Sequence, residues 1–361
     1  MRTYVVNTDA IRENLARIRK KAGKAAVIAV VKGDGYGLGL CALAELCRKE
    51  GIRAFAVTEA HDVRRLRQTA REEELILMLR PTEDPEELRI LLEEGAVCTV
   101  ASEHDAVVLS AAARELGLTA KAHLKIDTGM GRYGFLPEDR EQILSCFRSM
   151  ENLEICGVYT HLACAFCSRK KTRRQVEILQ GVVQEIRNAG FDPGMVHCAN
   201  SAALLRYPEY AMDAVRVGSA ILGRTLVREK LTRVGYCETR VESVRWLPKG
   251  HTCGYGSAWT AKKPTRIAVL PVGWYHGYAT QYGDDVFRVR DCLRKAASAL
   301  KGLFFRRQLT VLVGGEKCRV LGHVGMLHTV VDVTDKNIAP GETAVLDINP
   351  CRVRGMELRF D

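Results

Sequence analysis

The chain contains 361 residues, of which 47% are hydrophobic and 27% are charged, so its composition excludes a disordered protein and allows about two domains. The formal net charge is +11, but the basic residues are dispersed and only 6% of the residues are aromatic, which argues against nucleic-acid binding. No apolar run is long enough to span a membrane, and the N-terminus lacks the apolar core of a signal peptide. We therefore expect a cytoplasmic protein with no nucleic-acid or membrane partner.

The residues up to about 235 alternate between short apolar segments and amphipathic segments, which is the pattern of parallel βαβ units. Roughly eight such units predict a closed (β/α)8 barrel over residues 8–235. The expected strands cover residues 26–31, 53–57, 75–79, 99–100, 122–126, 155–160 and 194–197, and the expected helices include residues 41–50, 59–68, 103–116 and 173–189.

From residue 236 the sequence changes to short strand-like segments separated by glycine and proline turns. This change predicts a separate β-rich domain over residues 236–361, joined by a strand within residues 1–7. The helical signal in this part is confined to residues 291–303. The expected strands cover residues 2–6, 239–246, 267–271, 309–313, 317–321 and 343–346.

The 13 cysteines are scattered along the chain and include one Cys-x-x-Cys pair, formed by Cys164 and Cys167. A zinc site would normally need a second pair at similar spacing, so we expect no metal site. Reduced thiols in a cytoplasmic protein account for this distribution. A thioredoxin-like redox role of the one pair is the alternative.

Lys32 ends an expected apolar strand and stands directly before a glycine-rich turn that runs to Gly37. Parallel α/β barrels place their chemistry at the carboxyl ends of their strands. A partly desolvated lysine amine loses its proton more readily, so Lys32 is a candidate Schiff-base nucleophile. A solvated lysine that merely follows a core strand is the alternative.

A second glycine-rich turn follows another expected strand and brings together Lys125, Asp127 and Arg132. The planar guanidinium of Arg132 can grip a carboxylate, whereas an Asp127–Arg132 pair that only braces the loop is the alternative. His161 ends the next expected strand, where it is either a site residue or a satisfied core histidine.

Two later runs are candidate phosphate-binding segments. Asn200 and Ser201 suit the start of a helix, and Gly218 and Ser219 offer backbone amides near another loop-to-helix junction. Plain helix capping explains either run alone. Loops after the last two strands of a barrel usually hold phosphate, which favours the binding interpretation.

Taken in chain order, six motifs resemble those of the fold-type III alanine racemase family, whose members bind pyridoxal 5'-phosphate. The resemblance covers essentially the whole chain, and the last third is more similar to a divergent branch that includes serine/alanine racemase domains. The motifs cover residues 31–37, 125–135, 160–161, 200–203, 216–218 and 254–256.

The resemblance implies an amino-acid racemase that interconverts L- and D-alanine with two bases. Lys32 would bind the cofactor and serve one face of the substrate carbon, and Tyr255 would serve the other, because one side chain cannot remove a proton and return it to the opposite face. His161 and Arg216 would lie at the cofactor and form a hydrogen-bond chain that activates Tyr255, and Arg216 would face the pyridine nitrogen. In this family the tyrosine-bearing domain of one subunit completes the barrel site of the other, which implies a homodimer.

The resemblance also implies the binding residues. The phosphate would be held by Tyr36, Ser201 and the amides of Gly218 and Ser219. Arg132 and the backbone of Met326 would bind the substrate carboxylate. Lys125 matches a position that is often carbamylated, and a carbamate there would orient Arg132.

Several departures from the family pattern concern the substrate. The segments Gly273–Gly277 and Gly325–Leu327 differ from the usual motifs, an entrance tyrosine is replaced near Cys351, and residues 284–308 form a longer segment than usual. Alanine remains the expected substrate, with serine or another larger amino acid as the alternative. Two rival functions share the barrel: a noncatalytic pyridoxal phosphate carrier, which lacks a β domain, and a fold-type III decarboxylase, which Arg216 argues against.

Overall fold

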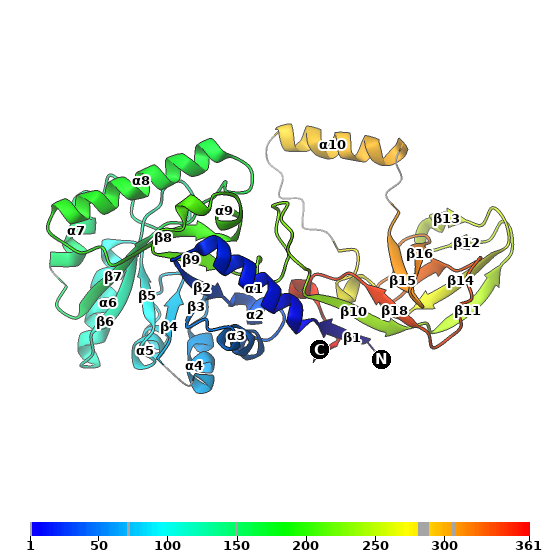
Figure 1. Cartoon of the computed structure of the whole chain (residues 1–361), viewed down its shortest axis with the longest axis horizontal. Helices are drawn as coiled ribbons and strands as arrows, with labels where there is room; N and C mark the ends of the chain where they lie inside the picture. The colour runs from blue at the N-terminus through cyan, green and yellow to red at the C-terminus, as the bar shows by residue number, and fades with distance from the viewer. Residues whose placement is uncertain (1, 71–72, 149, 281–288, 305–307) are drawn as a thin grey trace. The chain divides into compact units, whose positions relative to one another are not determined.

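The computed structural model of the chain describes residues 2–70, 73–148, 150–280, 289–304 and 308–361. These residues form two compact units (Figure 1). One unit is Thr8–Val234, and the other is Gly235–Asp361 together with Met1–Asn7.

The unit Thr8–Val234 is a closed barrel in which every neighbouring pair of strands is parallel, so the predicted (β/α)8 fold is confirmed. The last strand closes on the first, with Ala26 opposite Ala214. Most strand residues are buried on both faces, which explains why these segments read as apolar runs. The strands are β2 (Ala26–Val30), β3 (Ala54–Val57), β4 (Leu75–Met78), β5 (Val97–Val100), β6 (Ala120–Lys125), β7 (Leu153–Tyr159), β8 (Met195–Asn200) and β9 (Ala214–Val217).

Helices surround the barrel strands, as Figure 1 shows. Local capping fixes where several of them begin. Asp84 accepts a hydrogen bond from the amide of Glu87 and precedes Pro85, the first residue of α5, and Ser102 caps α6 in the same way. The helices are α1 (Thr8–Ala22), α3 (Leu40–Lys49), α4 (Ala60–Thr69), α5 (Pro85–Glu93), α6 (Glu103–Glu115), α7 (Arg140–Arg148), α8 (Arg169–Asn188), α9 (Ser201–Arg206) and the 3-10 turn η1 (Pro208–Tyr210). The short element α2 (Lys32–Tyr36) is a left-handed turn.

The second unit is built on one nine-stranded sheet with the order β11-β14-β17-β16-β15-β18-β10-β1-β19. The N-terminal strand β1 (Arg2–Val6) lies between β10 (Gly235–Arg240), to which it is antiparallel, and β19 (Glu357–Phe360), to which it is parallel. The remaining strands are β11 (Ser243–Leu247), β12 (Thr252–Cys253), β13 (Trp259–Thr260), β14 (Thr265–Leu270), β15 (Thr310–Val313), β16 (Glu316–Val320), β17 (Thr329–Asp332) and β18 (Thr343–Leu346). The 3-10 turns are η2 (Tyr255–Ser257), η3 (Trp274–His276) and η4 (Pro350–Arg352).

The predicted elements differ from the observed ones in a few places. The single strand expected over residues 239–246 is wrong, because β10 pairs with β1 and β18 whereas β11 pairs with β14. The strands β9, β12, β13, β17 and β19 are not among the ranges expected from the sequence. The helix expected over residues 291–303 is α10 (Val289–Phe304), while the start of the longer segment, residues 284–288, lies outside the described residues. Among the described helices, none combines the length and apolar sequence needed to cross a bilayer.

Candidate active site

Lys32 stands at the start of a left-handed turn that follows strand β2. Residues 33–37 all have positive φ, and the amides of Gly35 and Gly37 bond to carbonyls four residues earlier, at 2.9 and 3.0 Å. This turn places the backbone of Lys32 and Tyr36 about one helical turn apart. Lys32 is an exposed residue, yet partial desolvation of its amine and repulsion from the Arg132 guanidinium lower its pKa. A lower pKa leaves more of the amine neutral and able to act as a nucleophile or base.

A cradle of polar groups forms where β8 and β9 end. Ser201 Oγ accepts hydrogen bonds from the amides of Gly218 and Ala220, at 3.2 and 3.3 Å. Asn200, not Ser201, provides the cap of α9 by accepting from the amide of Ala203 at 3.0 Å. Tyr36 reaches the same place, because a Cβ added at Gly218 would collide with its ring and hydroxyl. The half-buried Ser219 is the next residue of this loop.

Arg216 lies at the centre of a buried hydrogen-bond chain inside the barrel. It donates to the carbonyl oxygens of Thr160, at 2.6 Å, and His197, at 3.3 Å, and to His197 Nδ1. A guanidinium has no acceptor, so His197 Nδ1 must be unprotonated and its proton must sit on Nε2. Nε2 then donates to Nδ1 of His123, 2.9 Å away. The charge on Arg216 therefore sets the tautomers of both histidines.

Burial keeps these histidines neutral. Desolvation, followed by the nearby Arg216 charge, lowers the pKa of His123 to about 4 and that of His197 well below 6.5. The same two causes, together with other nearby cations, lower the pKa of His161 to about 3. No hydrogen bond of the His161 ring occurs within the described part of the chain, so the implied His161–Arg216 link is electrostatic here rather than a hydrogen bond. His123 and His197 are site neighbours that the sequence reasoning missed.

In and before the turn that follows β6, Arg132 is exposed whereas Lys125 is buried. Asp127 accepts hydrogen bonds from the amides of Gly129, Met130 and Gly131 at 2.7–3.1 Å, so its carboxylate shapes the loop. The alternative Asp127–Arg132 ion pair is not formed among the described residues, which leaves the exposed Arg132 guanidinium available to an anion.

Lys125 is 2% exposed, and its Nζ lies 5.0 Å from the centre of the Tyr133 ring and 5.6 Å from that of Tyr159. Desolvation lowers the pKa of Lys125 to about 8, and repulsion from Arg132 and Arg216 adds to this effect. An appreciable fraction of this amine is therefore neutral near pH 8.

The remaining predicted residues, Tyr255 and Met326, belong to the β-rich unit. Tyr255 is 78% exposed at the start of η2, and Met326 is also exposed.

The segments Gly273–Gly277 and Gly325–Leu327, which differ from the usual family motifs, pack on each other. The Trp274 amide donates to the Gly325 carbonyl at 3.0 Å, and the Tyr275 amide donates to the Met326 carbonyl at 3.1 Å. A Cβ at Gly273 would collide with the Gly325 and Met326 carbonyl oxygens, so the two departures from the family pattern form one structural feature.

Comparisons with known proteins agree with the resemblance. Residues 6–225 match the family model "Alanine racemase, N-terminal domain", and residues 234–350 match "Alanine racemase, C-terminal domain". The chain is 32% identical to the alanine racemase of Methylacidiphilum infernorum, over 94% of this chain and 82% of the relative. It is 31% identical to that of Carboxydothermus hydrogenoformans, over 94% and 88% of the two chains.

Two solved structures show the same fold. The alanine racemase of the D-cycloserine producer Streptomyces lavendulae has a TM-score of 0.84 at 24% identity, covering 100% of this chain and 97% of the other. The Bartonella henselae enzyme, determined with covalently bound pyridoxal phosphate, has a TM-score of 0.82 at 20% identity, covering 100% and 99%. Both family models and the sequence relatives thus confirm the resemblance found in the sequence, and the chain belongs to the alanine racemase family.

Proposed function

We propose that this protein is a pyridoxal phosphate-dependent alanine racemase that acts as a cytoplasmic homodimer and produces D-alanine. The observation that carries the proposal is that one turn presents both Lys32 and Tyr36. The amine has a lowered pKa, and the phenol one turn away packs on Gly218 beside Ser201.

These residues fit the cofactor. An anionic phosphate needs hydroxyl and amide donors, and the cradle offers the hydroxyls of Tyr36 and Ser201 and the amide of Ser219. The amide of Gly218, also expected to bind phosphate, donates to Ser201 Oγ in this structure. The close approach of Tyr36 leaves no room for a Cβ at position 218. When bound, pyridoxal phosphate withdraws electrons from the substrate α-carbon and so acidifies its C–H bond. Burial lowers the pKa of Arg216, but a guanidinium stays protonated in proteins, so Arg216 would face the pyridine nitrogen as a donor and keep it unprotonated.

Racemisation needs a proton to leave one face of the α-carbon and another to arrive on the opposite face. Lys32 would take or give the proton on one face through its neutral or charged amine. Tyr255 of the partner subunit would do so on the other face through its hydroxyl. The high exposure of Tyr255 supports this role, because a residue that completes another subunit's site must be accessible from outside its own unit. Arg132 and the backbone of Met326 would hold the substrate carboxylate.

Alanine is the substrate that the named relatives indicate. Serine or a larger amino acid is not favoured by the comparisons, and neither is a noncatalytic carrier. A carrier of the one-domain type would lack the β-rich unit, whereas residues 234–350 of this chain match the C-terminal racemase domain.

The test is to incubate the cofactor-loaded protein with L-alanine, L-serine or longer L-amino acids in deuterated water. We would follow α-deuterium incorporation and the D-enantiomer together. Both should rise for alanine, and the variant Lys32→Ala should show neither. The proposal is refuted if Lys32→Ala keeps full activity or if the wild-type protein binds no pyridoxal phosphate. A bound cofactor without exchange on any amino acid would instead support the carrier.

A further inference from the structure

The left-handed turn after Lys32 contains two residues that are not glycine. Asp34 has a φ of 49° and Tyr36 a φ of 57°, between glycines at positions 33, 35 and 37. L-residues with a Cβ adopt this conformation at a cost, and aspartate tolerates it better than most because its short side chain can bond locally. Something outside the turn must therefore hold it in place.

The Asp34 carboxylate provides that hold on one side. Its Oδ1 accepts a hydrogen bond from the amide of Leu40 at 3.0 Å. Leu40 is the first residue of α3, and the preceding Gly39 has no side chain that could cap the helix. Asp34 thus supplies the missing cap, and its negative charge suits the positive end of the helix dipole. The turn also packs directly on this helix start, since a Cβ at Gly35 would lie 3.2 Å from the Leu40 nitrogen.

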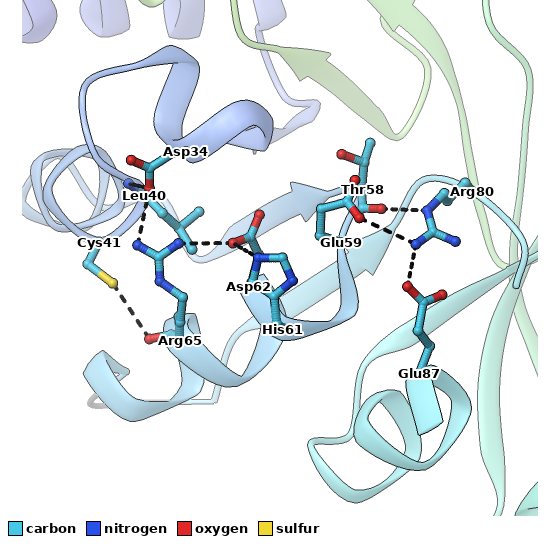
Figure 2. Close-up of polar contacts among 10 residues, drawn as sticks. All are labelled: Asp34, Leu40, Cys41, Thr58, Glu59, His61, Asp62, Arg65, Arg80 and Glu87. Carbon is cyan, nitrogen blue, oxygen red and sulfur yellow. Dashed lines mark hydrogen bonds and ion pairs between the residues drawn. The ribbon is translucent and has the colours of Figure 1, made fainter. Parts of the chain in front are cut away.

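The guanidinium of Arg65, on the next helix α4, also binds the Asp34 carboxylate, as Figure 2 shows. Arg65 of α4 donates from Nη2 to Asp34 Oδ1 at 3.1 Å and from Nη1 to Asp62 Oδ1 at 3.1 Å. Asp62 is only 3% exposed, so one partner of this fork is fixed in the protein interior. The planar fork of arginine holds both carboxylates in one geometry, which lysine would not do.

Other contacts in the same view do not reach the turn. Arg80 donates to the Thr58 carbonyl at 2.7 Å and to Glu87 at 2.5 Å, so it links the residue after β3 to α5 (Figure 2). Arg64, the neighbour of Arg65 on the same helix, pairs with Glu94 at 3.0 Å. Arg64 therefore offers a matched control for a cation on α4 that does not contact Asp34.

We infer that Asp34 is a positioning residue for the racemase site, with Arg65 as its anchor. By fixing the left-handed turn between the start of α3 and the buried Asp62, Asp34 would hold Lys32 and Tyr36 at the separation that the two ends of the cofactor require. This inference rests on the proposed function, in which these two residues bind the reactive group and the phosphate of pyridoxal phosphate. In this inference Asp34 acts through the turn rather than by contact with cofactor or substrate.

Four variants separate this role from a general loss of stability. Asp34→Gly keeps the left-handed backbone accessible but removes both contacts, while Asp34→Asn keeps an oxygen that can accept from the Leu40 amide. Arg65→Ala removes only the anchor, and Arg64→Ala is the control. The measurements are the dissociation constant of pyridoxal phosphate, the 31P NMR shift of the bound phosphate, and kcat and KM for alanine.

Losing two hydrogen bonds of ordinary strength should weaken cofactor binding in Asp34→Gly by about tenfold, with kcat reduced and KM changed less than about twofold. Arg65→Ala should show about a threefold effect, because exposed ion pairs contribute little by themselves. Asp34→Asn should remain close to wild type, and Arg64→Ala should be unchanged. The 31P shift should move in Asp34→Gly and Arg65→Ala, because Tyr36 is displaced from the phosphate.

Amide hydrogen exchange of residues 33–40 in the cofactor-free protein gives a readout that does not depend on the proposed function. Exchange should be at least about fivefold faster in Asp34→Gly than in the wild type, because the turn loses its two restraints. Unchanged exchange, unchanged cofactor affinity or equal effects of Arg65→Ala and Arg64→Ala would overturn the inference. If Asp34→Gly fails to fold, the comparison of the two arginine variants decides the matter. If the wild-type protein binds no cofactor but exchange is still faster in Asp34→Gly than in the wild type, the proposed function is refuted. The role of Asp34 in holding the turn would then still stand.

Discussion

The buried pair of His123 and His197 allows a quantitative prediction for the variant His123→Leu. Leucine has a similar volume but cannot accept the hydrogen bond from His197 Nε2, which spans 2.9 Å in the structure. The pair is enclosed, and a Cβ at Gly157 would lie only 2.5 Å from the His123 ring. The donor on His197 would therefore be left buried without a partner.

An unsatisfied buried donor costs about 2 kcal/mol in the free energy of unfolding. For a unit of the size of Thr8–Val234, which contains both histidines, that corresponds to a fall in Tm of about 4–8 °C. We expect this loss in full near pH 7.5, where His123 is neutral in both the folded and the unfolded chain.

The difference in stability between the wild type and His123→Leu should disappear at acid pH, because folding lowers the pKa of His123. The pKa of His123 falls from 6.5 to about 4 on folding, so the unfolded chain takes up a proton at higher pH than the folded protein does. The stability tied to neutral His123 is complete above the unfolded pKa and is lost as pH falls toward the folded pKa. Between pH 7.5 and 5 the wild type should lose about 2 kcal/mol through this group, which the leucine variant lacks. The two proteins should therefore have nearly equal stability near pH 5.

The assay is thermal unfolding of both cofactor-loaded proteins at pH 7.5, 6 and 5, with the difference in Tm read at each pH. Carboxylates titrate in both proteins, so their contribution cancels in the difference. His104→Gln, which changes an exposed histidine of α6, is the control for replacing a histidine outside the buried pair. A gap between wild type and His123→Leu that stays constant from pH 7.5 to 5 would refute the reasoning that His123 is buried in its neutral form.

Three further predictions concern residues at the cradle and the turn after β6. Gly218→Ala should weaken pyridoxal phosphate binding by about tenfold in equilibrium dialysis, because the new methyl group would meet the Tyr36 ring; unchanged affinity would show that Tyr36 can move aside freely. Arg132→Lys should raise KM for alanine by about tenfold with a smaller change in kcat, because lysine cannot grip a carboxylate with two parallel hydrogen bonds. Lys125, whose pKa is lowered to about 8, should form a carbamate in 13C-labelled bicarbonate that increases as pH rises through that value. The carbamate 13C NMR signal should be missing from Lys125→Gln, and a signal that persists there would assign it to another amine.

The barrel could be predicted from the sequence because its strands are buried on both sides and appear as short apolar runs. The exception is β9, whose four residues include Arg216, and this charge interrupts the apolar pattern. The edge strand β19 has the sequence Glu-Leu-Arg-Phe and is exposed throughout, so it carries neither an apolar run nor a buried face. The sequence predicts one strand in place of β10 and β11 because no glycine or proline separates them.

The candidate site residues at strand ends could be proposed from the sequence because each stands next to an apolar run and a glycine-rich or capping segment. His123 carries no such mark, because its partner His197 lies 74 positions away on another strand of the barrel. Asp34 is visible in the sequence only as a polar residue in a glycine-rich turn. Its function as a cap depends on Gly39 lacking a side chain and on Arg65 reaching it from another helix. Contacts between residues so far apart in the sequence can be recognised only in the three-dimensional structure.

The distribution of the site residues over the two units predicts how their substitutions should differ. The residues that would hold the cofactor all lie in the unit Thr8–Val234, whereas Tyr255 lies in the β-rich unit. Tyr255→Phe should therefore keep the cofactor affinity and absorbance of the wild type, because only a hydroxyl outside the barrel is removed. Proton exchange should continue on the face that Lys32 serves, so one alanine enantiomer should still gain α-deuterium while inversion falls by at least about a hundredfold. Equal loss of exchange for both enantiomers would mean that Tyr255 is needed to assemble the site rather than to carry a proton. Undiminished inversion would mean that another group serves the second face.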